Sequence, residues 1–201
     1  RDDDQGTWIT YGFDNLLLTR ELKLMGQHNV SNVMAALALG RVAGLPMAAM
    51  LAVVREFRGL PHRCEFVRSL DGVDYINDSK GTNVGATVAA IQSLMPEQGQ
   101  VVLIAGGDGK GADFSPMAEP VARCCRRVLV LGADADRLAS ALADTVPVER
   151  VGSLDEAVAR ARAVARPGDR VLLSPACASF DMFRDYQDRG DQFRQRVEAL
   201  L

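Results

Sequence analysis

The chain has 201 residues, of which 48% are apolar, so it can bury the core of one large domain, or of one domain and a piece of another. A net charge of −3 argues against a nucleic-acid partner. No run of eighteen apolar residues occurs, which predicts that no segment spans a membrane. Because the first residues also lack an apolar signal segment, we expect a cytoplasmic protein. We further expect a monomer. The cysteines are expected to be reduced rather than to bind zinc, because no C-x-x-C spacing occurs.

The first sixty residues form a group of short predicted elements. Strands are expected at 7–11, 15–18 and 21–25, and helices at 29–42 and 46–57. The first helix is indicated by apolar residues at helical spacing, and Gly44 and Pro46 separate it from the second. This set is too small for a whole domain. We therefore place a boundary at residue 60 and expect that the chain is a fragment, since it also begins without Met.

Strands and helices alternate regularly after that boundary. The Asp71-Gly72 pair predicts a hairpin at the start. The predicted strands are 63–70, 73–77, 101–105, 127–131, 147–150 and 170–173, and the predicted helices are 84–94, 115–124, 134–143, 154–165 and 181–199. Alternation of this kind is typical of an α/β fold. We predict a Rossmann-like, mostly parallel sheet with helices on both faces.

Two loops carry the same arrangement of an Asp, a small residue and a Lys. They are Asp78-Ser79-Lys80 and Asp108-Gly109-Lys110, and each follows a strand-like apolar run. The chain has only three lysines against twenty arginines, and two of the three lie in these loops. A compact ammonium is therefore favoured at both places. Ligands of α/β sheets bind beyond the carboxyl ends of the strands, so the two loops predict an anion or phosphate site.

Other interpretations of these loops stay open. The glycines around Asp108 could serve only a tight turn that needs positive φ. Gly107-x-Gly109-x-x-Ala112 also fits the loose dinucleotide fingerprint, which would make the protein an oxidoreductase domain. A binding module without catalysis is a third class. The loop is not a Walker A sequence, because the spacing and the Ser or Thr after the Lys are absent. Thr82 or Asn83 could simply cap the following helix.

Three more segments hold polar candidates. The small residues of 174–179 would let a ligand approach the backbone, and Ser179 can donate to a carboxylate, although Ser179 or Asp181 could instead cap the last helix. Cys177 lacks a helper residue for nucleophilic catalysis.

Asn29 and Asn32 fall one helical turn apart, and capping would explain Asn29 but not Asn32. His62 and Arg63 follow the domain boundary. Arg63 could reach a phosphate, or it could form a surface ion pair at a hinge.

Together these motifs resemble the Mur ligases, and among them the members that add D-glutamate. The matching stretches run in family order from about residue 22 to the C-terminus. They are Gly26-Gln27-His28-Asn29 with Asn32, Gly59-Leu60-Pro61-His62-Arg63, Asn77-Asp78-Ser79-Lys80-Gly81-Thr82-Asn83, Gly106-Gly107-Asp108-Gly109-Lys110-Gly111-Ala112-Asp113-Phe114-Ser115-Pro116, Leu173-Ser174-Pro175-Ala176-Cys177-Ala178-Ser179-Phe180-Asp181 and Arg189-Gly190. Gly81 and Tyr186 depart from some members, which carry Ala and Phe there.

The resemblance implies the domain organisation. Residues 1–60 would be the C-terminal part of a P-loop-type central ATPase domain, and 61–201 a complete C-terminal domain that binds the incoming amino acid. The chain has no phosphate loop and none of the family's Mg²⁺ ligands, so we expect no metal site in this part and no activity from the chain alone.

The resemblance also implies the reaction and its residues. ATP, with Mg²⁺, would activate UDP-N-acetylmuramoyl-L-alanine as an acyl phosphate, which D-glutamate then attacks in peptidoglycan precursor synthesis. ATP would contact Asn29 and Asn32 at adenine, Asp78 at ribose, and Arg63 and Lys80 at the phosphates. D-Glutamate would contact Thr82, Lys110, Ser179, Phe180 and Tyr186, and His62 and Lys80 would be catalytic.

Overall fold

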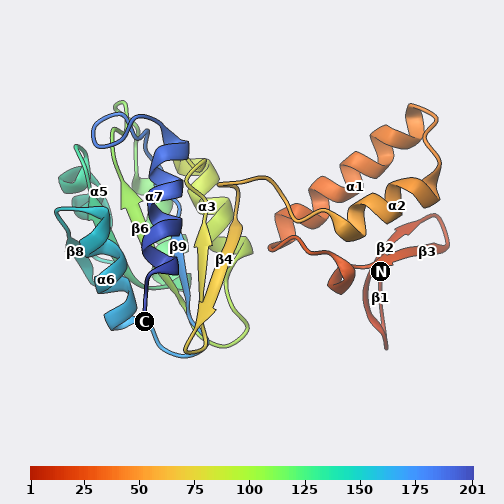
Figure 1. The fold of residues 1–201 in the computed structure, drawn as a ribbon, viewed down its shortest axis with the longest axis horizontal. Coiled ribbons are helices and arrows are strands. Elements are labelled where there is room, and N and C mark those ends of the chain that lie inside the picture. The colour runs from red at the N-terminus through yellow and green to blue at the C-terminus, as the bar shows by residue number, and fades with distance from the viewer. The chain divides into compact units, whose positions relative to one another are not determined.

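The computed structural model describes residues 1–201, which divide into two compact units, Arg1–Gly59 and Leu60–Leu201 (Figure 1). The first unit holds a three-stranded antiparallel sheet and two helices. Its elements are β1 (Asp2–Asp3), β2 (Gly6–Tyr11), β3 (Asp14–Leu18), the 3-10 helix η1 (Thr19–Glu21), α1 (Gln27–Val42) and α2 (Met47–Glu56). A small core of Ile9, Leu17, Val33 and Leu37 joins the sheet to α1.

The strand predicted at 21–25 is wrong. Residues Thr19–Glu21 form a 3-10 turn, and no strand follows it. The Glu21 carboxylate accepts a hydrogen bond from the Leu18 backbone N–H (3.0 Å) and pairs with Arg55 of α2 (2.8 Å). These contacts fold the chain back on itself, so the alternating side chains of this segment find no partner strand.

The second unit is built on a six-stranded sheet in the order β4-β5-β9-β6-β7-β8. Its strands are β4 (Glu65–Leu70), β5 (Val73–Asn77), β6 (Val101–Gly106), β7 (Cys125–Leu131), β8 (Val148–Arg150) and β9 (Arg170–Leu173). Only β4 runs antiparallel to its neighbour. Asp71 and Gly72 join β4 to β5 with positive φ at both residues (51° and 75°), as a type I′ hairpin requires. The predicted hairpin and mostly parallel sheet are confirmed.

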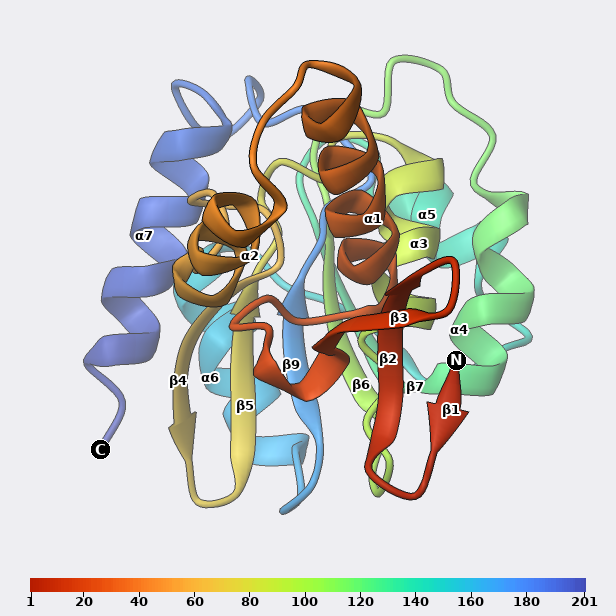
Figure 2. The same cartoon turned by 90° about the vertical axis from the view of Figure 1, so that its right-hand side faces the viewer.

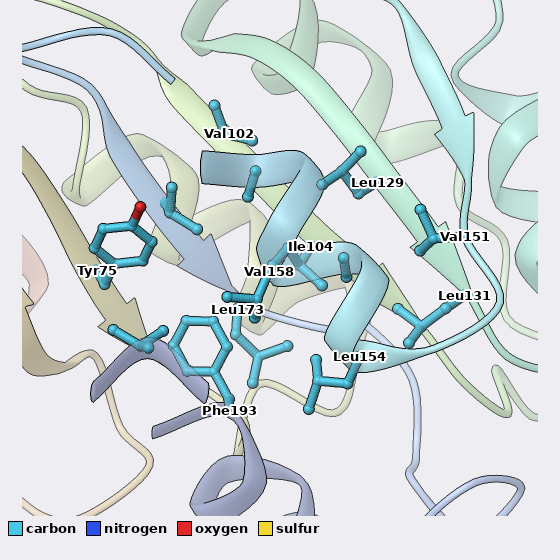
Figure 3. Packing of buried hydrophobic residues seen from close by; sticks show 14 of the residues in the cluster. Tyr75, Val102, Ile104, Leu129, Leu131, Val151, Leu154, Val158, Leu173 and Phe193 are labelled. Atoms are coloured by element: carbon cyan, nitrogen blue, oxygen red, sulfur yellow. The ribbon is translucent and has the colours of Figure 1, made fainter. Parts of the chain in front are cut away.

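Helices cover both faces of this sheet. They are α3 (Val84–Ser93), α4 (Ala118–Cys124) after the 3-10 helix η2 (Ser115–Met117), α5 (Ala135–Ala141), α6 (Leu154–Val164) and α7 (Tyr186–Glu198). α3 and α4 lie on one face and α6 on the other (Figure 2). Figure 3 shows the core beneath α6 and α7, where Val158 and Phe193 pack on alternate residues of the strands, among them Ile104 and Leu129. None of the helices is both long and apolar enough to cross a membrane.

The last helix begins at Tyr186 rather than at 181. Asp185 is its N-cap, and the Asp185 carboxylate accepts a hydrogen bond from the Asp188 N–H (2.7 Å). The preceding residues are not helical, because Asp181 reaches across to the loop after β7. There the Asp181 carboxylate accepts a hydrogen bond from the Ala133 N–H (2.8 Å). A long loop therefore follows β9 at the carboxyl end of the sheet.

A buried ion pair closes the opposite end of the sheet. Asp169 is 1% exposed, and its carboxylate accepts two hydrogen bonds from the Arg126 guanidinium (2.6 and 3.0 Å). The backbone N–H groups of Gln100 and Arg166 also donate to it (both 2.8 Å). This network ties the starts of β6, β7 and β9 together, far along the strands from their carboxyl ends.

Candidate functional site

The strand order brings three loops together at the carboxyl edge of the second unit's sheet. β9 lies between β5 and β6, so the loop after β9 lies between the two Asp-x-Lys loops. The Ala176 N–H donates to the Gly81 carbonyl (2.9 Å), and the Gly106 N–H donates to the Pro175 carbonyl (2.8 Å). Both predicted loops are thereby tied to the segment that carries Ser179. The antiparallel β4 begins at the same edge, because Glu65 pairs with Asn77.

The glycine-rich loop after β6 is fixed against the loop after β9. Asp108 and Ala178 exchange backbone hydrogen bonds of 3.1 and 2.8 Å, which form an isolated antiparallel bridge. A Cβ at Gly107 would lie 2.1 Å from the Ala178 carbonyl oxygen, so only glycine permits this approach. The Asp134 carboxylate accepts a hydrogen bond from the Gly109 N–H (2.7 Å). The loop is therefore held from both sides.

Lys110 stands at the turn of this loop. Its φ is 52°, and its N–H donates to the Asp108 carboxylate (2.9 Å). The turn interpretation thus accounts for the glycines and for Asp108, whose carboxylate closes the turn. It does not account for the Lys110 side chain, which is exposed at the carboxyl edge and available to an anion.

Asp78 is buried in the loop after β5. Its carboxylate accepts hydrogen bonds from the Ser174 hydroxyl (2.7 Å) and the Cys64 N–H (3.2 Å). Burial raises the pKa of this carboxyl above its usual value, although both hydrogen bonds oppose the shift. Asp78 therefore joins the loop after β5 to the loop after β9, whatever ligand it meets.

His62 is also buried and has a positive φ of 62°. The Asn77 side-chain amide lies 3.1 Å from His62 Nδ1. If the amide nitrogen donates this bond, Nδ1 is the acceptor and Nε2 carries the proton; Nε2 lies 3.8 Å from an Asp191 carboxylate oxygen. The His62 carbonyl accepts a hydrogen bond from the Lys80 N–H (3.0 Å). This geometry has His62 holding the backbone of Lys80, while its catalytic role stays a prediction.

Lys80 and Tyr186 meet directly. The Lys80 ammonium lies 4.2 Å from the centre of the Tyr186 ring, and the His62 ring contacts the same tyrosine edge-on. A residue predicted for the ATP phosphates therefore touches a residue predicted for D-glutamate. The two predicted ligand sites are neighbours at this edge.

Helix capping explains one of the four residues in the second unit for which it was an alternative. Asn83 is the N-cap of α3 and accepts a hydrogen bond from the Ala86 N–H (2.9 Å), so capping explains Asn83 and leaves Thr82. Neither Ser179 nor Asp181 caps α7, because Asp185 does. Ser179 is buried within the loop after β9, whereas the next side chain, Phe180, is 69% exposed.

Asn29 and Asn32 lie in the first unit. The N-cap of α1 is Gly26, so the capping explanation of Asn29 is wrong. The Asn29 amide instead donates to the Met25 carbonyl (2.7 Å), and the Asn32 amide donates to the Asn29 side-chain oxygen (3.1 Å). The two side chains act as a pair, and their adenine role stays a prediction.

Three further residues differ in burial, because Arg63 is exposed whereas Cys177 and Arg189 are buried. Arg63 is exposed and forms no ion pair within its unit, so the surface ion-pair explanation finds no partner there. Cys177 is buried, and burial raises the pKa of its thiol to about 12, which opposes a nucleophilic thiolate at neutral pH. Arg189 is a buried residue to which the sequence analysis assigns no role. Its only sequence signal is its place in the Arg189-Gly190 motif, because a buried arginine looks like a surface one in a sequence.

Comparison with solved structures identifies the fold. MurF ligase from Thermotoga maritima, solved in complex with ADP, superposes with a TM-score of 0.67 over 96% of this chain and 46% of that chain, at 16% identity. UDP-N-acetylmuramate-alanine ligase MurC from the same organism gives 0.64 over 89% of this chain and 39% of that chain, at 20% identity. At these identities the likeness shows the fold alone.

The sequence then settles the family. The profile described as "Mur ligase, glutamate ligase domain" matches residues 62–177, and the chain belongs to this family. UDP-N-acetylmuramoylalanine--D-glutamate ligase from Marinobacter nauticus is 72% identical over 200 residues, and its counterpart from Pseudomonas aeruginosa is 54% identical over 200 residues. The matches cover 100% and 99% of this chain but only 45% of each relative. The oxidoreductase alternative gains no support.

Proposed function

We propose that this chain is part of an ATP-dependent ligase that joins D-glutamate to UDP-N-acetylmuramoyl-L-alanine in the cytoplasm, as a step of peptidoglycan precursor synthesis. The observation that carries the proposal is the 72% identity, over the whole chain, to a relative named for that ligation. In this proposal residues 1–60 end the central ATPase domain, and 61–201 bind the amino acid. The remaining part of the longer protein supplies the phosphate loop.

The proposed reaction has two steps. An oxygen of the L-alanyl carboxylate attacks the γ-phosphorus of ATP, the bond to the β-phosphate oxygen breaks, and ADP leaves. The D-glutamate nitrogen then attacks the acyl carbon, loses a proton, and phosphate leaves with the electrons of the C–O bond. Mg²⁺ would offset the phosphate charge. In this proposal Mg²⁺ is bound mainly by residues in the rest of the longer protein.

The loops after β5, β6 and β9 suit the amino-acid substrate. D-Glutamate carries two carboxylates, and an ammonium with nearby hydroxyls is suited to them. Lys110 would pair with one carboxylate, and the hydroxyls of Thr82 and Ser179 would donate to them. Phe180 and Tyr186 would line the site with ring or backbone contacts.

The nucleotide would lie next to this site. Lys80 and Arg63 would contact the phosphates and Asp78 the ribose, while Asn29 and Asn32 would meet adenine. The Lys80 ammonium would contact the transferred phosphoryl group. His62 would hold the backbone of Lys80 through the 3.0 Å hydrogen bond from the Lys80 N–H to the His62 carbonyl. Closure of this domain over the nucleotide would keep water from the acyl phosphate.

A phosphate-release assay tests the proposal. The longer protein that contains this chain should release phosphate from ATP only when UDP-N-acetylmuramoyl-L-alanine and D-glutamate are both present, and L-glutamate should not replace D-glutamate. The 201-residue chain alone should release none, because it has no phosphate loop to hold the nucleotide and its Mg²⁺. Phosphate release from the chain alone, or an equal response to L-glutamate, would contradict the proposal.

A further inference from the structure

Arg189 places a guanidinium inside the second unit without a carboxylate partner. The residue lies in the first turn of α7 and is 2% exposed. All of its hydrogen bonds go to neutral oxygens. Its Nε donates to the Ser79 hydroxyl (2.9 Å) and its Nη2 to the Ser79 carbonyl (2.9 Å). The remaining bonds, of 3.3 to 3.4 Å, go to the carbonyls of Cys177 and Ala178.

Burying a guanidinium without a carboxylate partner costs free energy, which its other contacts must offset. A buried charge without a counter-charge has lost its hydration, and neutral carbonyls replace only part of it. Burial accordingly lowers the pKa of Arg189 to about 10, while the charges of Asp181 and Asp78 act against this shift. The guanidinium still carries its proton at neutral pH. An apolar side chain would fill the same space with less loss of hydration, but it could not bind several oxygens at once.

The oxygens that Arg189 binds belong to two different loops. Ser79 lies between Asp78 and Lys80, and its hydroxyl also donates to the Tyr186 carbonyl (2.8 Å). Cys177 and Ala178 lie directly before Ser179. Ala178 in turn forms the backbone bridge to Asp108, in the loop that carries Lys110. One rigid, planar group therefore joins the loop after β5 to the loop after β9, and the Ala178–Asp108 bridge extends this connection to the loop that carries Lys110.

We infer that Arg189 is a positioning residue that fixes the separation between Lys80 and the Ser179–Lys110 pair, and so couples the nucleotide site to the amino-acid site. The inference rests on the proposed function, since it concerns the same reaction. Arg189 touches neither substrate in the proposed reaction. It acts through Ser79 on one side and through the carbonyls of Cys177 and Ala178 on the other.

Kinetics of the longer protein test the coupling. A lysine side chain keeps the charge but has a single nitrogen, which cannot span both loops. Arg189→Lys should raise KM for D-glutamate and KM for ATP together, each by roughly tenfold, because small misplacements of binding groups are costly in a closed site. The control is Arg126→Lys, which weakens the ion pair at the opposite edge. It should lower the melting temperature and leave both KM values within about twofold, as expected for a distant site.

A second variant and a second measurement protect the test. If Arg189→Lys does not fold, Ser79→Ala decides the matter, because it removes the Nε acceptor and the link to Tyr186 without adding bulk. Hydrogen exchange of the substrate-free protein should show faster exchange in both 78–82 and 174–179 in either variant. Hydrogen exchange can be measured even if the unmodified protein shows no ligase activity. Failure of the proposed function can therefore be told apart from failure of the inference about Arg189.

Two results would overturn the inference. The first is a lower melting temperature with both KM values unchanged, as in Arg126→Lys, which would make Arg189 purely structural. The second is faster exchange in only one of the two loops, which would show that the guanidinium does not couple them.

Discussion

The Lys80 ammonium lies over the face of the Tyr186 ring, 4.2 Å from its centre, and Tyr186 is the first residue of α7. A cation–π contact of this kind contributes about 0.5–2 kcal/mol, and more when water is excluded. The His62 ring meets the same tyrosine edge-on, with 5.9 Å between the ring centroids. The position of Lys80 therefore depends on an aromatic side chain at 186, and only weakly on its hydroxyl.

Replacing that ring should impair the nucleotide side of the reaction. We expect Tyr186→Leu in the longer protein to raise KM for ATP by about 2- to 30-fold, the range that corresponds to the cation–π contribution. Tyr186→Phe is the matched control and should stay near the unmodified value. Steady-state kinetics with ATP varied and D-glutamate saturating give the answer. If Tyr186→Leu raises KM for D-glutamate and leaves KM for ATP unchanged, Tyr186 contributes only to binding of the amino acid.

Lys110 should control D-glutamate far more than ATP. We choose Lys110→Asn because φ at this position is 52°, where Asn is tolerated and the loop can keep its shape. Loss of the charge-assisted contact should cost roughly 2 kcal/mol, at the lower end of the range for buried pairs because the side chain is exposed before the ligand binds. KM for D-glutamate should rise about 30-fold, with KM for ATP unchanged. An equal effect on both would contradict the assignment.

Arg63 should contribute to the nucleotide side through its fork of donors. Its side chain is exposed and unpaired within its unit, so it is available to phosphate oxygens. Arg63→Ala should raise KM for ATP, and Arg63→Lys should restore only part of the loss, because lysine cannot grip two oxygens in the same way. Small-angle scattering of the ATP complex would report the closed form. If ATP kinetics and scattering both stay unaltered in Arg63→Ala, Arg63 is a surface residue.

The Asp169–Arg126 pair should give the chain a definite acid dependence. Burial alone would raise the pKa of Asp169, but Arg126 and two backbone N–H groups outweigh it and lower the pKa below 3.8. A lowered folded-state pKa stabilises the fold at pH values above the unfolded pKa, and this contribution is lost as the pH falls through the folded value. Asp169→Asn should therefore destabilise the chain at pH 7 by roughly 2–3 kcal/mol, less than a fully buried pair because Arg126 reaches water.

Urea unfolding followed by circular dichroism at about pH 7, 5 and 3 would check this dependence. The difference between Asp169→Asn and the unmodified chain should be constant from about pH 7 to 5 and should shrink below pH 3.8. A difference that persists unchanged at the lowest pH would show that the carboxylate charge does not matter.

Local patterns are enough to predict the elements of the second unit. Asp71-Gly72 predicts the hairpin because a type I′ turn needs positive φ at two consecutive residues, which few residue pairs accept. Strand-like apolar runs that alternate with segments of helical spacing predict the parallel sheet. Positions at the carboxyl ends of strands follow from the same pattern. The sequence pattern therefore suffices to assign Lys80, Lys110 and Ser179 to loops at one edge of the sheet.

Contacts between distant segments cannot be predicted in this way. The segment 21–25 alternates like a strand but is folded back by the Glu21–Arg55 pair, which joins residues far apart in the sequence. The predicted start of α7 is too early because Asp181 is bound to a different loop. Arg189 gives no sign of burial, since its partners are backbone oxygens that any sequence supplies, together with one serine hydroxyl.

The place of β9 in the sheet has a consequence for biosynthesis. β5 and β6 do not pair with each other, because β9 lies between them, and β9 leaves the ribosome well after both. Until then the edges of β5 and β6 that face each other stay unpaired, and unpaired edges invite wrong association. The nascent sheet must therefore remain unfinished until β9 has been synthesised. A product terminated before that point would lack an inner strand and would be a natural target for chaperones and proteases.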